Sequence, residues 1–277
     1  MNLKISFWVG VILLKFSLSL SILFFVGACA SLPGKKLSSS QSLNVLFAPQ
    51  STLFEMTDKS GRFDFNRESG KTPDNRYVVK QQIRVPDGDR KVVEQSISFS
   101  QIGKLRGEID ILRPALSQYT VWFDGDRYFS ELKTDVEKKS LVVNMVSPEP
   151  EWNGQKTFPF PDDNAVYCYF SQIIECAFIT GFIEKAIEKR AGTMNLIILW
   201  EGYPFFMQQY PEIPQEAFTR AVLEFDGQTK DQGLRFSLRF AGQSIFYFVT
   251  KSGRYDRHFW VAQGLSVVRK GSQSEGP

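Results

Sequence analysis

The sequence predicts a mainly β protein, in the form of a curved antiparallel meander or half-barrel with one packed α-helix at about residues 171–190. Three observations lead to this prediction. From residue 76 onward, short runs rich in β-branched and aromatic residues recur at the spacing of about 8 to 12 residues that is typical of all-β folds. Turn residues separate these runs. A single segment places its apolar residues at helical spacing.

Two hairpins are expected in the first part of the domain. The runs at 76–85 and 92–100 flank the turn Pro86-Asp87-Gly88-Asp89, and the runs at 118–123 and 127–133 flank Asp124-Gly125. Asp-Gly between strands is a strong hairpin signal because both central turn positions need positive φ. The run "LVVNMVS" at 141–147 predicts a further strand.

The helix prediction comes from "SQIIECAFITGFIEKAIEKR" at 171–190. Its apolar residues recur at three- and four-residue intervals, and Gly192 follows as the expected terminator. Because short strands alone would leave exposed edges, we expect the apolar stripe of this helix to lie across the sheet.

The C-terminal part predicts five more strands, at 220–225, 234–240, 244–250, 256–262 and 265–270, with turns at Asp226-Gly227 and Ser252-Gly253. Alternation is clear in "LRFSLRF" at 234–240, where leucine and phenylalanine share one face. The run "SIFYFVT" at 244–250 is apolar at successive positions, so we expect cover on both of its faces or a contribution to a cavity.

The N-terminus has the features of an export signal. Lys4 gives a basic start, and Lys15 leaves residues 16–26 as the uninterrupted apolar core. This core is shorter than the ~20 residues that cross a bilayer, and small residues follow it. We therefore expect cleavage. A retained signal anchor and a secretory signal cleaved elsewhere are the alternatives.

The motif Val26-Gly27-Ala28-Cys29 resembles the lipobox of bacterial lipoproteins, which has a branched apolar residue, two small residues and an obligatory cysteine. The resemblance covers only this N-terminal segment. It implies transfer of a diacylglyceryl group to the Cys29 thiol, cleavage before Cys29, and acylation of the new amino terminus. More than one acyl chain is what stable membrane attachment requires.

The residues after the cysteine bear on the membrane in which such a protein is held. In lipoproteins, Asp directly after the modified cysteine favours retention in the inner membrane, whereas this chain has Ala30 and Ser31 there. We therefore expect a lipid-anchored protein of the cell envelope, in the outer membrane and facing the periplasm if the source is a Gram-negative bacterium.

The domain organisation follows from composition. Residues 1–28 are the expected signal peptide, and 29–42 are a lipidated flexible tether rich in Ser, Gly, Pro and Lys. No comparable linker interrupts the chain after residue 42, so 43–270 are expected to form a single β-rich domain, with 271–277 as a polar tail.

The charge of the chain argues against a nucleic-acid binder. Removal of residues 1–28 takes away Lys4 and Lys15 and no acid, so the formal net charge falls from +3 to +1. Nucleic-acid binders show basic clusters well in excess of acids. The membrane, through Cys29, is the partner that the sequence indicates.

The other two cysteines, Cys168 and Cys176, would lie in an oxidising compartment after export, where a disulfide can form. On one continuous helix their Cα atoms would be about 12 Å apart, beyond the ~7 Å limit for bridging. A disulfide therefore requires the helix to begin after Cys168. Two buried thiols are the alternative.

Catalytic and metal-binding patterns are weak in this sequence. His258 is the only histidine, and no G-x-S-x-G motif marks a nucleophilic serine to pair with it. One histidine and two cysteines do not make a usual zinc site, and no cofactor motif is present. The acid pairs Asp87/Asp89 and Asp124/Asp126 lack the further ligands of an EF-hand and fit turns better.

The segment 199–214, "LWEGYPFFMQQYPEIP", has the densest aromatic content. Aromatic residues near turns can stack on sugars or hold acyl chains, whereas the simpler interpretation is packing into the core beneath the helix. As candidate ligand-binding residues we take Trp200, Tyr203, Phe205, Phe206 and Tyr210.

A half-open barrel with a helix on its concave face resembles the lipoprotein carriers and receptors of the bacterial envelope, the LolA/LolB-like group. This resemblance rests on strand number, compartment and aromatic content, and it concerns the fold. We expect a non-catalytic role in binding a hydrophobic or glycan ligand or an envelope partner, with an apolar concave groove. An envelope hydrolase acting on glycan or lipid is the alternative, and it requires two carboxylates, or His258 with a nucleophile, in a cleft.

Overall fold

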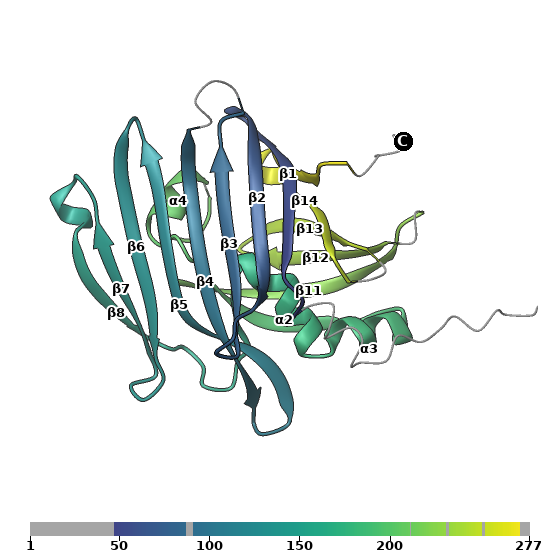
Figure 1. The fold of residues 1–277 in the computed structure, drawn as a ribbon. Coiled ribbons are helices and arrows are strands. Elements are labelled where there is room, and N and C mark those ends of the chain that lie inside the picture. Colours follow the sequence, from purple (N-terminus) through teal and green to yellow (C-terminus); the bar gives the residue numbers. More distant parts are fainter. Residues whose placement is uncertain (1–46, 87–90, 211, 231–232, 251–252, 272–277) are drawn as a thin grey trace, which may run out of the picture. The chain divides into compact units, whose positions relative to one another are not determined.

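The structure is a computed structural model that describes residues 47–86, 91–210, 212–230, 233–250 and 253–271. Within these residues, fifteen strands form one open sheet with the order β8-β7-β6-β5-β4-β3-β2-β1-β15-β14-β13-β12-β11-β10-β9 (Figure 1). The mainly β fold class predicted from the sequence is confirmed. The strands are β1 Gln50–Asp58, β2 Gly61–Lys71, β3 Arg76–Arg84, β4 Val92–Leu105, β5 Ile109–Phe123, β6 Asp126–Asp135, β7 Ser140–Val146, β8 Gly154–Pro159, β9 Tyr167–Tyr169, β10 Thr193–Leu199, β11 Phe218–Gln228, β12 Leu234–Phe240, β13 Gln243–Val249, β14 Tyr255–Trp260 and β15 Leu265–Arg269.

The sheet consists of two consecutive meanders, which we call the N-terminal half-sheet (β1–β8) and the C-terminal half-sheet (β9–β15). They are joined by antiparallel pairing of β1 with β15, in which Phe54 lies opposite Arg269 and Met56 opposite Val267. The β9–β10 pair is parallel. The first and last strands of the described chain are therefore central in the sheet, and β8 and β9 form its two edges.

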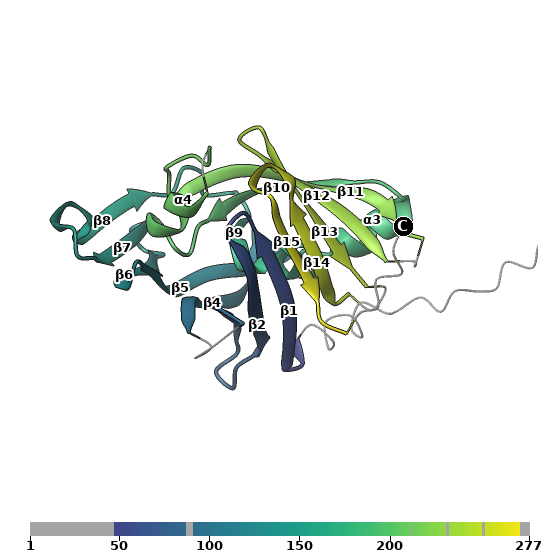
Figure 2. The same ribbon diagram turned by 90° about the horizontal axis from the view of Figure 1, so that it is seen from above.

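The helices pack against strands of the two half-sheets (Figure 2). Helix α2 (Ile173–Ile179) packs on β5 and β9, and α3 (Phe182–Lys189) packs on β10 and β11. A short helix, α4 (Phe205–Gln209), contacts β6. Single 3₁₀ turns cover Pro150–Trp152, Phe170–Gln172 and Val261–Gln263.

The single helix predicted at 171–190 is wrong in its continuity, because the structure divides it into α2 and α3. The hydroxyl of Thr180 donates to the backbone oxygens of Cys176 (2.9 Å) and Ala177 (3.1 Å), which provides caps for the end of α2. Gly181 then has φ +69°, a left-handed conformation that costs glycine little. The apolar periodicity continues through the break, so periodicity alone predicted one helix.

The core fills the space between the half-sheets and includes residues from both of them. Strand β12 shows the predicted alternation, since Leu234, Phe236, Leu238 and Phe240 are all buried, while Arg235 and Arg239 are exposed. Burial of alternate apolar side chains at about 25 cal/mol per Å² is the main term that stabilises such a sheet.

Strand β13 only partly matches the cover expected on both of its faces. Ile245, Tyr247 and Val249 are buried on the inner face, whereas Phe246 and Phe248 on the outer face are half-buried. The cover on that side comes from the neighbouring strand β14, because the rings of Phe248 and Phe259 lie 5.6 Å apart. Cross-strand aromatic contacts thus replace a second layer.

Of the turn predictions, Asp124-Gly125 is confirmed and Asp226-Gly227 is wrong. Of the predicted turn at Ser252-Gly253, only Gly253 belongs to the described residues, where it lies between β13 and β14 with φ +82°. Asp124 and Gly125 form the β5–β6 turn, both with positive φ as predicted. Asp226-Gly227, in contrast, lies inside β11, where the register with β12 shifts between Phe225 and Gly227. This bulge accommodates the glycine without ending the strand. The predicted turn residues 87–89, the lipobox at 26–29, the tether to residue 42 and the tail residues 272–277 lie outside the described residues.

Candidate functional site

The five aromatic residues singled out in the sequence lie in the core between the half-sheets. Trp200, Tyr203, Phe205 and Tyr210 are at most 8% exposed, and Phe206 is half-buried. The rings of Trp200 and Phe206 are stacked with centroids 5.5 Å apart, and those of Tyr210 and Trp260 are stacked at 5.0 Å. The structure therefore brings these residues together as packing, the simpler of the two interpretations.

Two details explain why this segment packs so closely. The indole N–H of Trp200 donates to Thr219 Oγ1 (2.9 Å), so the polar atom of the buried ring is satisfied. A Cβ at Gly202 would lie 2.5 Å from Phe206 Cβ and 2.8 Å from the ring of Tyr119. Only glycine fits where the segment passes β5, and the concave face is filled by side chains at this point.

A buried polar cluster lies between β2, α2 and β14. Arg67 Nη2 is 2.7 Å from Glu175 Oε1, with the two side chains only 9% and 6% exposed, and Arg67 also donates to the backbone oxygen of Ser171 (3.0 Å). Tyr255 OH is hydrogen-bonded to His258 Nδ1. Burial, with a smaller effect from Arg67, lowers the pKa of His258 to about 3, so the imidazole is neutral.

This cluster does not make a hydrolase site. His258 and Ser171 line the same cavity, and in the described residues neither His258 Nε2 nor Ser171 Oγ has a hydrogen-bond partner. The cavity, however, is about 40 Å³, whereas ligand pockets are ~300–1,000 Å³. A glycan or lipid substrate does not fit there.

The buried Glu201 and the half-buried Glu94 are the remaining candidates for catalytic carboxylates. Glu201 accepts backbone N–H groups from Phe170 (3.0 Å) and Ser171 (2.9 Å) at the beginning of the helical region, and burial raises its pKa. Glu94 accepts from Gln209 Nε2 (3.1 Å), and burial raises its pKa to about 7. Neither acid lines any of the pockets described here. These hydrogen bonds give the two acids a structural role, in which Glu201 holds the backbone before α2 and Glu94 holds Gln209 at the end of α4.

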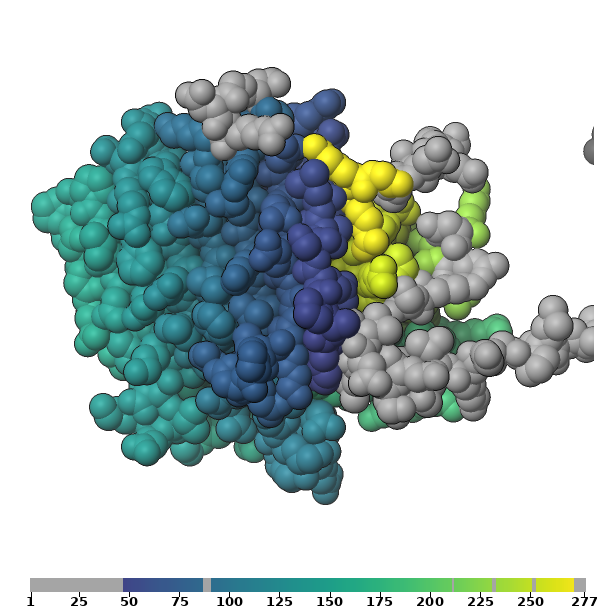
Figure 3. Space-filling model, in the orientation of Figure 1, coloured from purple at the N-terminus to yellow at the C-terminus, as the bar shows by residue number. Residues whose placement is uncertain are grey.

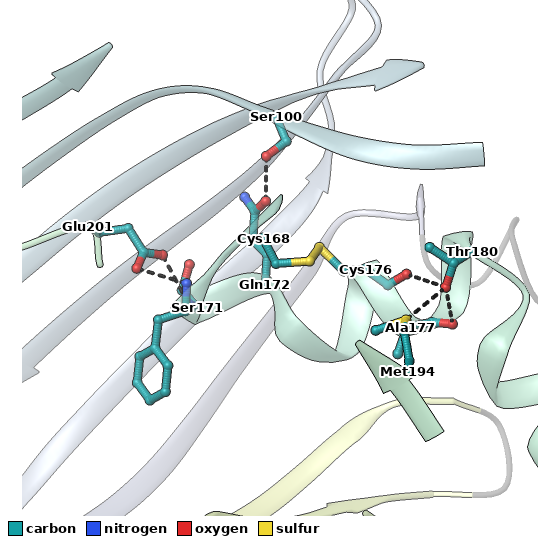
Figure 4. The surroundings of a disulfide bond; sticks show 10 residues. Ser100, Cys168, Ser171, Gln172, Cys176, Ala177, Thr180, Met194 and Glu201 are labelled. Atoms are coloured by element: carbon teal, nitrogen blue, oxygen red, sulfur yellow. Dashed lines mark hydrogen bonds between the residues drawn. A yellow bond between two sulfur atoms is a disulfide. The ribbon is translucent and has the colours of Figure 1, made fainter. Parts of the chain in front are cut away.

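The structure joins Cys168 of β9 to Cys176 of α2 by a disulfide, with Cα atoms 6.4 Å apart (Figure 4). The α-helix begins at Ile173, after Cys168, which is the condition that the sequence set for this bond. Both cysteines are fully buried. The bond ties the edge strand of the C-terminal half-sheet to the helix that packs on β5.

An open pocket of about 320 Å³ is lined by residues from both half-sheets, and we call it the inter-half pocket. The N-terminal half-sheet contributes residues from β4, β5, β6 and the β6–β7 turn, and the C-terminal half-sheet contributes one residue each from β9 and the end of β10. The connection between β8 and β9 supplies the remaining lining residues. At the pocket, Lys139 of the β6–β7 turn and Asp163 of the segment after β8 form an exposed ion pair. The apolar lining residues are Leu105, Ile111, Pro114, Val136, Phe160, Ala165, Tyr167 and Leu199.

None of these lining residues was predicted from the sequence as part of a site. They come from separate strands and turns, and each is an ordinary apolar residue in its own segment. The one local signal is Val136, an apolar residue in the β6–β7 turn that is 55% exposed. A lone exposed valine is normal on protein surfaces, so this signal alone does not identify a site.

In the described part of the chain, no helix is long and apolar enough to cross a membrane. No group of three or more His, Cys, Asp or Glu residues suited to a metal ion occurs in the same part. Comparison of the chain with protein-family models, with curated proteins and with solved structures finds no match.

Proposed function

We propose that the protein is a lipid-anchored, exported protein of the bacterial cell envelope whose folded domain binds a hydrophobic ligand in the inter-half pocket and has no catalytic role. The observation that carries the binding role is the pocket itself, which has the size and apolar lining typical of ligand sites. The concave groove expected from residues 199–214 does not support binding, because the five candidate aromatic residues of this segment belong to the core or pack against it.

Two further observations support export and anchoring. Disulfides persist in oxidising compartments such as the bacterial periplasm and are rare in the cytosol, so the Cys168–Cys176 bond agrees with an exported chain. The sequence Val26-Gly27-Ala28-Cys29 supplies the acceptor for the lipid. The outer membrane, facing the periplasm, is the location that Ala30 and Ser31 favour in a Gram-negative source.

The anchor is tested by metabolic labelling with a fatty acid in cells that express the wild type or Cys29→Ser. We expect label in the wild type and none in the variant, since the thiol is the acceptor. Equal labelling of the two proteins would refute the anchor. The binding role is independent of this result.

The binding role is tested with a photo-crosslinking amino acid placed at Val136 in the full chain, followed by mass spectrometry of the protein from irradiated cells. The matched control is Val146, which is 54% exposed, against 55% for Val136, and lies outside the inter-half pocket. We expect small-molecule adducts of apolar mass at position 136 and not at position 146. Adducts at neither position, or the same adducts at both, would overturn the proposal.

A further inference from the structure

A second hollow, of about 400 Å³, lies on the outer face of the N-terminal half-sheet, the face turned to the viewer in Figure 3. Strand register places three carboxamide side chains next to one another on this face. Asn66 of β2 lies opposite Gln82 of β3, and Gln82 lies opposite Gln95 of β4. We call these three residues the amide row. On the same face, Thr120 of β5 lies opposite Gln95, and Phe129 of β6 lies opposite Thr120.

Two members of the amide row have free side chains. Gln82 Oε1 accepts both Nε (3.0 Å) and Nη2 (2.5 Å) of Arg84, which occupies its carbonyl. Within the described residues, Asn66 and Gln95 make no side-chain hydrogen bond. Each therefore offers two N–H donors and a carbonyl acceptor to a ligand.

The surroundings of the amide row are polar and nearly balanced in charge. Lys80 and Arg127 provide two positive charges, and Glu68 provides one negative charge. At the β6 end of the hollow, the guanidinium of the exposed Arg127 lies 5.2 Å from the centre of the Phe129 ring. A nucleic acid would need a basic cluster, and an apolar ligand would need an apolar lining, so neither fits this hollow.

We propose that the hollow binds an uncharged oligosaccharide. Sugar hydroxyls both donate and accept hydrogen bonds, which matches the paired donors and acceptors of Asn66 and Gln95. The five strands from β2 to β6 span about 19 Å at ~4.8 Å per strand, which gives room for several sugar rings in a chain. This site is separate from the inter-half pocket, so it stands whether or not that pocket binds an apolar ligand.

The test is calorimetric titration of the full-length protein in detergent with two water-soluble probes, a β-linked hexasaccharide of N-acetylglucosamine and one of glucose. The variants are Asn66→Ala and Gln95→Ala. The matched control is Gln155→Ala, because Gln155 is an exposed glutamine on β8, away from the hollow, and its side chain is bonded to Asn144. Val136→Glu serves as a second control at the inter-half pocket.

We expect the wild type to bind at least one hexasaccharide, and we expect each amide variant to raise the dissociation constant about three- to tenfold. The two controls should bind as the wild type does. Binding of only the acetylated probe would show that the amide row reads acetamido groups, and binding of both would show that it reads the hydroxyls. Circular dichroism verifies that each variant is folded, and Gln95→Glu removes the donor while it keeps the shape of the side chain.

Two results would overturn the proposal. The first is a wild type that binds neither hexasaccharide. The second is binding that Asn66→Ala and Gln95→Ala leave unchanged, which would place the sugar elsewhere on the molecule. Neither result bears on the apolar ligand, because its test uses crosslinks from Val136.

Discussion

The aromatic segment and the inter-half pocket meet at the end of β10, where Leu199 lines the pocket and Trp200 stacks in the core. The aromatic segment, residues 199–214, stands out in the sequence by its aromatic content, and its aromatic side chains pack in the core and leave no groove there. The pocket is inconspicuous in the sequence and is open. The comparison teaches that the densest aromatic segment of this sequence forms part of the packed core. The pocket, in contrast, forms where side chains from strands distant in sequence leave space between the two half-sheets.

The largest effect that tests this comparison is expected from Trp200→Ala. The indole is fully buried and bonded to Thr219, so its removal should lower the free energy of unfolding by about 3–5 kcal/mol. Urea unfolding followed by circular dichroism measures this loss. Val261→Ala, at a side chain that is 70% exposed, is the control and should change it by less than ~0.5 kcal/mol. Similar losses in both variants would contradict the packed core.

The buried ion pair is the next test, because it holds α2 to the N-terminal half-sheet. Glu175→Gln leaves Arg67 buried without its counter-charge, which should lower the free energy of unfolding by about 3 kcal/mol. The exposed pair Lys104–Asp110 is the control, and Asp110→Asn should cost less than ~1 kcal/mol. The same urea experiment compares them, and an equal cost at both sites would show that burial of the first pair has little effect.

The disulfide connects the inter-half pocket to the core, since Cys168 follows the pocket residue Tyr167 and Cys176 belongs to the buried helix α2. The double variant Cys168→Ala/Cys176→Ala should lower the free energy of unfolding by about 2–3 kcal/mol, the effect of closing so short a loop. A reducing agent should move the urea midpoint of the wild type toward that of the variant. A wild-type midpoint that does not respond to reduction would argue against a bonded pair in the isolated protein.

The pH dependence of stability tests whether water is excluded near the end of the aromatic segment, where Gln209 donates to Glu94. Burial raises the pKa of Glu94 from 4.5 to about 7, so between these values the folded state holds more protons and the free energy of unfolding falls as pH rises. Glu94→Gln should reduce this fall by on the order of 1–2 kcal/mol. His258, whose lowered pKa has the opposite effect, is common to both proteins. Urea unfolding at pH 5 and pH 8 measures the difference, and identical pH responses would show that Glu94 is solvated.

The smallest effect on stability is expected at the pocket. Val136→Glu should change the free energy of unfolding by less than ~0.5 kcal/mol, as should Val146→Glu, because both side chains are more than half exposed. Thermal unfolding of the three proteins checks this expectation. A large loss in Val136→Glu alone would make this residue part of the core, and the contrast between the two regions would fail.

The sequence predicts the elements that local chemistry determines. Asp124-Gly125 forms its turn and β12 alternates, because each depends on neighbouring residues only. Strand β2 escaped prediction since its inner face carries Arg67 and Ser69, and Arg67 is stable there through Glu175, 108 residues away. The pocket escaped for the same reason, as its residues meet only when the half-sheets come together. The split between α2 and α3 depends on Gly181, whose conformation the apolar pattern does not reveal.

The pairing of β1 with β15 has a consequence for the order of events in the life of this chain. A ribosome makes the first partner long before the last, so the most central ladder of the sheet forms only when synthesis has reached Arg269. Pairings so distant in sequence form slowly. Under the export that we propose, the chain would cross the membrane unfolded, and β15, which unites its two halves, would be the last strand to reach the far side.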